Sequence, residues 1–269
     1  MSTWMNAPTV SRRWLLDSRR GMIGWSLGLL AVVMLYLPLY SSMKQTDLLS
    51  AKLDALPKEM LEGFGMSANT MSTPWGYTQQ TVFGMVGMLV LLSAAIGQGA
   101  RAIAGDEESG GLELTLAHAT TRRGVLLARA LAVTMIVLLL TAVLGLGTLA
   151  VNGSSGLDLP AWHIAAVTLA LGLLCVLHAT AALAAGAITG RRGMSLAIAS
   201  TLAGLGYFAH TMGARVGEWV PSLSPFHWAF ATEPLHTGFD WGGLALLTGV
   251  TFVFFGLAWA GFERRDLRA

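Results

Sequence analysis

Charged residues are scarce in this chain, and their scarcity excludes an ordinary soluble protein. Only 12% of the 269 residues are charged, whereas 54% are hydrophobic. Soluble domains carry about 25% charged residues, so these charges are too few to cover a surface that faces water. The 32 glycines and 13 methionines fit a helical membrane protein, because glycine is commoner in transmembrane helices than in soluble ones.

Cysteine and lysine are nearly absent, which excludes several kinds of covalent, metal-binding and nucleotide-binding site. The single cysteine, Cys175, excludes an internal disulfide and a cysteine-cluster metal site. The three lysines, Lys44, Lys52 and Lys58, follow Met, Ala and Pro, so the Gly-Lys-Ser/Thr step of a P-loop does not occur. The six histidines do not form the His-Glu-x-x-His pattern of zinc proteases. We therefore expect no enzyme, no metal site and no cofactor in this chain.

Long apolar runs dominate instead. A spanning helix needs roughly 20 mostly apolar residues, and six segments qualify. We expect an all-α integral membrane protein with one transmembrane domain over residues 1–269, built as a six-helix bundle. The expected spans are about 21–43, 81–104, 125–151, 161–189, 194–213 and 242–262.

The basic residues alternate between the connecting segments. Thirteen of the seventeen Lys and Arg lie at the N-terminus, between the second and third spans, between the fourth and fifth, and at the C-terminus. Basic residues accumulate on the cytoplasmic side of a membrane. We therefore expect a multi-pass protein of the plasma (inner) membrane with both termini in the cytoplasm, and the lipid bilayer rather than a nucleic acid as its surroundings.

Three flanking segments also predict helices. Residues 10–20 mix apolar side chains with Arg12, Arg13 and Trp14, which predicts a short helix at the cytoplasmic interface. This helix is either a contact surface for a cytoplasmic partner or a basic anchor. Leucines at helical spacing in residues 44–78 predict an external helix. Prolines and aromatics in residues 214–241 predict short interfacial or re-entrant helices before the last span.

The loop between the second and third spans is charged and partly apolar. Three acidic residues come first, a glycine pair follows, and alternating leucines precede two arginines. Such a module is either a device that transmits force from a soluble motor into the bilayer or an ordinary anchoring loop. Its residues are Asp106, Glu107, Glu108, Gly110, Gly111, Leu112, Glu113, Leu114, Leu116, Arg122 and Arg123.

This loop resembles that of the permease subunits of ATP-binding-cassette exporters of the type-2 branch. Those commonly carry an acidic pair, a glycine, a leucine-rich turn and a Pro-Ser/Thr-Arg step after the second span. Gly111 departs from this pattern, because a hydroxyl residue is common there. The matching positions are Glu107, Glu108, Gly110, Leu112, Leu114, Leu116, Thr121 and Arg122. The segment 56–77 and the ending 262–267 also resemble the family, so the resemblance covers essentially the whole chain. Ala119 departs from it, because proline is common there.

The resemblance implies a cytoplasmic coupling helix that docks on a separate P-loop ATPase, which would hold the ATP and Mg. It also implies a second copy of the chain or a paralogous permease, and an export pathway lined by spans two and five. The cargo would be apolar or amphipathic: a drug, a lipid-like metabolite or a peptide. The implied contacts with the ATPase are Glu107, Glu108, Gly110, Leu112, Glu113 and Arg122, followed by Arg12, Arg13 and Trp14.

A few polar side chains lie within the spans themselves. His178, His210 and Gln98 are candidates for the substrate pathway, because polar groups at membrane depth are costly and often functional. Hydrogen bonding between helices is the competing interpretation. An intramembrane enzyme and an ion-coupled secondary transporter are the alternative functions, but both predict more ionisable residues inside the bilayer. No Asp or Glu lies in the middle of any expected span, which favours an external energy source.

Overall fold

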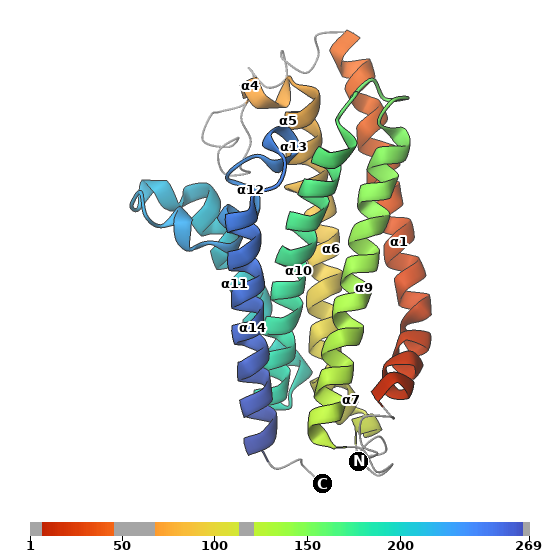
Figure 1. Ribbon diagram of the computed structural model, residues 1–269, viewed down its shortest axis with the longest axis vertical. Helices are drawn as coiled ribbons and strands as arrows, with labels where there is room; N and C mark the ends of the chain where they lie inside the picture. The colour runs from red at the N-terminus through yellow and green to blue at the C-terminus, as the bar shows by residue number, and fades with distance from the viewer. Residues whose placement is uncertain (1–6, 46–67, 113–120, 266–269) are drawn as a thin grey trace.

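The computed structural model describes residues 7–45, 68–112 and 121–265, and this part of the chain is helical without any strand. Long helices run side by side along the length of the molecule, and short helices gather at the end that is uppermost in Figure 1. The long helices are α1 (Ala7–Gln45), α6 (Val86–Ala100), α9 (Arg122–Val151), α10 (Ala161–Thr189), α11 (Arg192–Met212) and α14 (Trp241–Arg264).

Five segments of the described chain are long and apolar enough to cross a membrane: Ser18–Ser42, Pro74–Glu108, Arg122–Val151, Ala161–Thr189 and Trp241–Arg264. The expected fifth span, 194–213, coincides with α11, whose 21 residues extend about 31 Å. This helix is therefore long enough, but its serines, threonines, His210 and Arg192 make it less apolar than the other five. The all-helical membrane fold is confirmed, whereas the sixth crossing stays a prediction.

Helix α10 lies at the centre of the bundle. It contacts α6, α9, α11 and α14, and 78% of its most apolar window is buried. The corresponding windows of α1 and α14 are only 22% buried, and they expose large apolar side chains such as Leu27, Leu35 and Phe252. Apolar exposure of this kind suits lipid or another protein rather than water.

The second span is longer and less regular than expected. The sequence predicts 81–104, but the helical stretch runs over Pro74–Glu108. Its centre α6 is flanked by two π-helical turns, η1 (Gln79–Phe83) and η2 (Arg101–Gly105), and the short α7 (Asp106–Glu108) follows. Single π-helical turns often mark functional positions in a helix.

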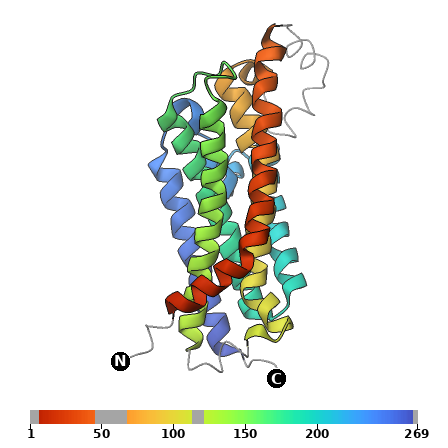
Figure 2. The ribbon, with the colours of Figure 1, turned by 90° about the vertical axis from the view of Figure 1, so that its right-hand side faces the viewer.

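The first turns of α1 and the last turns of α14 lie at the same end of the bundle, called here the lower end as drawn in Figure 1. Figure 2 shows that the first turns of α1 run obliquely across this end. They form one continuous helix with the first span, so the expected N-terminal interfacial helix is not a separate element.

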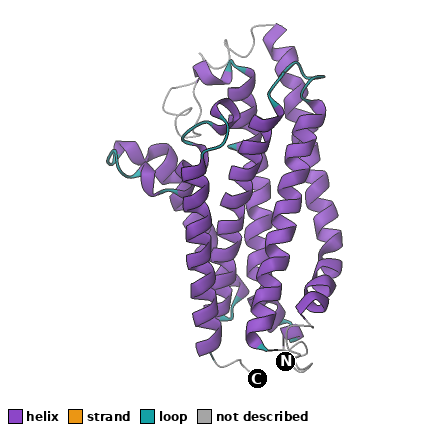
Figure 3. Cartoon of the chain, in the orientation of Figure 1, coloured by secondary structure: helices purple, strands orange, loops and turns teal. Residues whose placement is uncertain are grey.

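The upper end carries the short helices, which Figure 3 shows beside the tops of the long ones. Prolines occupy the first helical position of several of them, where a missing N–H costs nothing. The leucine-rich external helix expected around residues 49–60 lies outside the described residues. The short helices are α4 (Ala68–Met71), α5 (Pro74–Thr78), η3 (Gly213–Arg215), η4 (Pro221–Leu223), α12 (Pro225–Phe230) and α13 (Pro234–Thr237).

Candidate functional site

Three consecutive carboxylates, Asp106, Glu107 and Glu108, form a single turn at the lower end. We call this segment, α7, the acidic turn. It directly continues the second span and immediately precedes the loop 113–120, which lies outside the described residues. Each carboxylate bonds to a different helix of the bundle.

Asp106 pairs with α9. The Arg129 guanidinium lies 2.5 Å from the Oδ2 atom of Asp106. The Arg129 side chain is 7% exposed and the Asp106 side chain is 18% exposed. A buried charge without a partner is expensive, so this pair neutralises an arginine that α9 would otherwise carry into the apolar interior.

Glu107 pairs with Arg265, the residue that follows α14. The Glu107 side chain is only 9% exposed. Gly190, between α10 and α11, lies against this pair, and a Cβ at Gly190 would overlap the Arg265 guanidinium. The glycine also adopts a left-handed conformation, with φ +65°. Both the backbone turn and the ion pair therefore require glycine at this position.

Glu108 caps α11. Its Oε1 accepts a hydrogen bond of 2.8 Å from the backbone N–H of Arg192, the first residue of that helix. A carboxylate at a helix N-terminus also interacts favourably with the helix dipole. The acidic turn is thereby joined to α9, α11 and α14 at once.

A further set of contacts joins α9 directly to α14. The Arg122 guanidinium donates a 2.9 Å hydrogen bond to the Arg265 carbonyl oxygen. Arg123 pairs with Glu263 and lies 5.5 Å from the centre of the Trp259 ring. The lower end is therefore a network of charges that spans four segments of the chain.

The residues predicted to contact an ATPase are distributed unevenly over this network. Glu108 is exposed, Glu107 is mostly buried in its ion pair, and Leu112 is 1% exposed and part of the apolar core. Gly110 has φ +72° and turns the chain after the acidic turn. Glu113 lies outside the described residues, as do the side chains of Arg12, Arg13 and Trp14 on α1.

Four partners in the network were missed from the sequence: Arg129, Arg192, Glu263 and Arg265. The available signal was the count of basic residues on one side of the membrane, which indicates orientation but not pairing. The pairs join residues up to 158 positions apart, and no local pattern encodes such a separation.

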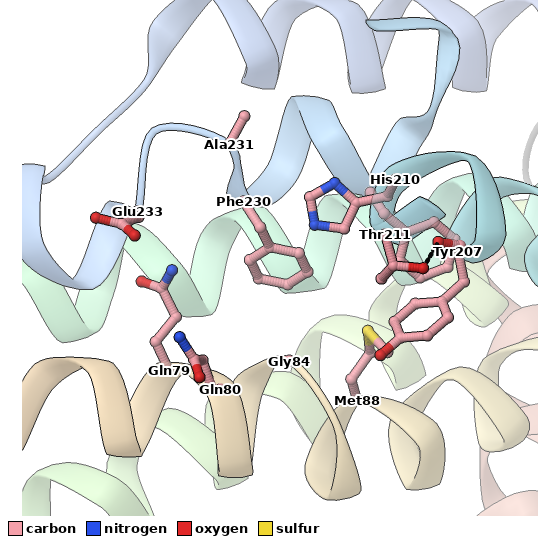
Figure 4. Close-up of a pocket in the computed structure, with 11 residues that line it drawn as sticks. Gln79, Gln80, Gly84, Met88, Tyr207, His210, Thr211, Phe230, Ala231 and Glu233 are labelled. Carbon is pink, nitrogen blue, oxygen red and sulfur yellow. Dashed lines mark hydrogen bonds between the residues drawn. The ribbon is translucent and has the colours of Figure 1, made fainter. Parts of the chain in front are cut away.

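A second candidate site is a cavity between the second span and α11. Its upper lobe, about 220 Å³, is lined by residues of η1, α6, α11 and the α12–α13 segment (Figure 4). Its lower lobe, about 420 Å³, is an apolar groove between α6 and α11. Met88, Tyr207 and Phe226 line both lobes, so the two are adjacent.

The three polar residues predicted for a substrate pathway are not equivalent. His210 lines the upper lobe, and its ring lies beside Phe230 in Figure 4. His178 is fully buried, its Nδ1 is 2.9 Å from the Leu174 carbonyl oxygen, and its ring lies 5.4 Å from that of Phe226. Gln98 is 7% exposed. Neither His178 nor Gln98 lines either lobe.

The structure thus places a charged network at the end of the second span and a cavity beside that span. Comparison with protein families gives a match over residues 9–267 to the family described as "ABC-2 family transporter protein". The chain belongs to the ABC-2 transporter family. A search of curated proteins found no match.

Membership in the ABC-2 family confirms the resemblance inferred from the loop and the two flanking segments. This ABC-2 protein is thereby a membrane transport subunit rather than an enzyme. The acidic turn and the cavity both lie within the matched residues.

Proposed function

We propose that this chain is the membrane-spanning subunit of an ATP-driven exporter, and that its ATPase is a separate protein that holds ATP and Mg. The observation that carries this proposal is the position of the acidic turn. It ends the second span, precedes the loop 113–120 and bonds to α9, α11 and α14. The chain also contains no P-loop, so the energy must come from a partner.

In this proposal the ATPase docks at the lower end and pushes on the loop that follows the acidic turn. Because each carboxylate is bonded to another helix, a displacement of the turn displaces α9, α11 and α14 together. Coupling through a packed network requires two discrete arrangements of such contacts. The ion pairs supply contacts that can break in one state and form again in the other.

The remaining parts of the proposal concern partners and orientation. A second copy of the chain, or a paralogous permease, would complete the pathway, and the cargo would be apolar or amphipathic. The apolar lower lobe between α6 and α11 is consistent with such cargo. Both termini would face the cytoplasm of a cell whose plasma membrane the protein crosses six times, with α11 as the fifth crossing.

The docking part is tested by placing a bulky side chain on the acidic turn. Ser109 is exposed at the end of this turn, and its hydroxyl donates to the Asp106 carbonyl oxygen, three residues earlier. Ser109→Trp should leave the permease folded but block the ATPase. The measurement is co-purification of the tagged permease with a P-loop ATPase encoded beside it, together with ATP hydrolysis by the complex.

Ser154→Trp is the matched control. Ser154 is exposed in the turn at the upper end, and its hydroxyl also donates to a carbonyl oxygen three residues earlier, that of Val151. This variant should retain the ATPase. Equal recovery of the ATPase with both variants would place the docking surface elsewhere, and a wild-type chain that recovers no ATPase would overturn the exporter proposal.

A further inference from the structure

The upper lobe of the cavity differs from the lower lobe in its chemistry. It is lined by Gln79, Gln80, His210, Thr211 and Glu233 in addition to aromatic and aliphatic groups, whereas the lower lobe is lined mainly by apolar residues of α6 and α11. A molecule that occupied both lobes would place a polar head at the top and an apolar body below.

Glu233 supplies the charge of the upper lobe. Among the described lining residues it is the one acidic side chain, and none of these residues is a Lys or Arg. Within the described part of the chain its carboxylate accepts no hydrogen bond and forms no ion pair. Figure 4 shows this carboxylate above Gln79, at the edge of the lobe.

The backbone holds Glu233 in an unfavourable conformation. Its φ of +53° lies in the left-handed region, which is unfavourable for a residue with a Cβ. The conformation is fixed from both sides, because its N–H donates to the Phe230 carbonyl oxygen and its own carbonyl oxygen accepts from His236. Strain of this kind at a cavity is often associated with function.

Two other residues that line the upper lobe, Gln79 and His210, also support a functional role for it. The Gln79 side-chain oxygen accepts a 2.9 Å hydrogen bond from the Leu235 N–H, which fixes the start of α13 next to Glu233. The Nδ1 atom of His210 is buried and has no hydrogen-bond partner among the described residues. A histidine nitrogen accepts a hydrogen bond without a proton and donates one with it, so His210 retains a polar atom that no described residue satisfies.

We propose that the upper lobe binds the cationic head of an amphipathic molecule, with Glu233 as its counter-charge and the apolar groove between α6 and α11 holding the rest. An unpaired carboxylate in a partly enclosed site attracts a cation, and interactions between charges strengthen where water is excluded. The inference rests on the proposed exporter function, because it names the class of cargo for that pathway. It predicts that the cargo consists of organic cations rather than organic anions.

The test is equilibrium binding to the purified chain in nanodiscs of phosphatidylcholine, without any ATPase. The probes are tetraphenylphosphonium and tetraphenylborate, which have nearly the same shape and opposite charge. The wild type should bind the cation in preference to the anion. Glu233→Gln should weaken binding of the cation by about tenfold or more, because it removes the attraction between opposite charges, which is strong where water is partly excluded.

Glu218→Gln is the control, because Glu218 is an exposed acid in the same upper segment that does not line the lobe. It should change the affinity by less than about twofold, as surface substitutions usually do. Unchanged binding in Glu233→Gln, or equal binding of both probes by the wild type, would overturn the inference. A chain that recovers its ATPase but shows no cation preference would refute the cargo class and leave the exporter proposal standing.

A second measurement uses the wild type alone and does not depend on the folding of a variant. A hydrophobic carbodiimide should modify Glu233, and mass spectrometry of peptides should locate the adduct. Tetraphenylphosphonium should slow this modification, whereas tetraphenylborate should not. Modification that is insensitive to the cation would overturn the inference.

Discussion

Glu107, in the acidic turn, forms an ion pair with Arg265, 158 residues further along the chain and just beyond the last helix. The pair closes the lower end of the bundle by joining the second span to the end of α14. Because both partners are mostly shielded from water, the pair is part of the packed structure. Its integrity should therefore affect both stability and coupling.

Removing the charge of Glu107 should destabilise the protein. Glu107→Gln keeps the volume but leaves the Arg265 guanidinium without its counter-charge, and breaking a buried pair in this way costs roughly 3 kcal/mol. Thermal unfolding in mild detergent should show a clearly lower Tm. Glu263→Gln is the control, because its partner Arg123 is 64% exposed and an exposed pair is worth about 0–1 kcal/mol. Equal effects of the two variants would contradict the assignment of Glu107 to the interior.

A side chain at Gly190 should disturb the same pair. Gly190→Ala introduces a Cβ at φ +65°, which costs about 1–2 kcal/mol, and this atom would displace the Arg265 guanidinium. If the alanine acts partly through the pair, the losses in Gly190→Ala and Glu107→Gln should not add in the double variant. Strict additivity of the two unfolding free energies would show that the glycine matters for its backbone alone.

The close approach of the second span to α10 should depend on one glycine. A Cβ at Gly99 would overlap the Ala179 carbonyl oxygen, whereas a Cβ at Gly97, on the same helix, meets nothing within 4 Å. Gly99→Ala should therefore destabilise the bundle by about 1–3 kcal/mol through overpacking. Gly97→Ala should be neutral or slightly stabilising, since alanine favours the helix. The comparison is made by unfolding each variant in the same detergent.

The sixth crossing can be tested by the accessibility of single cysteines. Cys175 is buried and is the one cysteine in the sequence, so a Cys175→Ala background gives a clean starting point. Ser154→Cys and Ser222→Cys should both react with a membrane-impermeant maleimide added outside intact cells, and Ser109→Cys should not. If α11 does not cross, Ser222→Cys will instead behave like Ser109→Cys.

Secondary structure was largely accessible from the sequence, for identifiable reasons, whereas the orientation in the membrane stays a prediction. The third, fourth and sixth spans were predicted within a few residues of α9, α10 and α14, because apolar runs of membrane length have few alternative structures. The second span was predicted too short, since π-helical turns at 79–83 and 101–105 have no signature in composition. The acidic turn stood out as a motif, but its partners did not.

The sequence by itself determined that this protein is a helical membrane protein of the ABC-2 type and that its 269 residues hold no P-loop. Apolar length, scarcity of charge and the absence of a P-loop are local properties, so one chain read in order reveals them. Only the tertiary structure decided which charges neutralise one another and which polar groups line a cavity. Glu107 is mostly buried, Glu108 is exposed and Glu233 has no ion-pair partner among the described residues. These differences arise where helices distant in sequence meet, because burial and pairing depend on those neighbours rather than on the residues themselves.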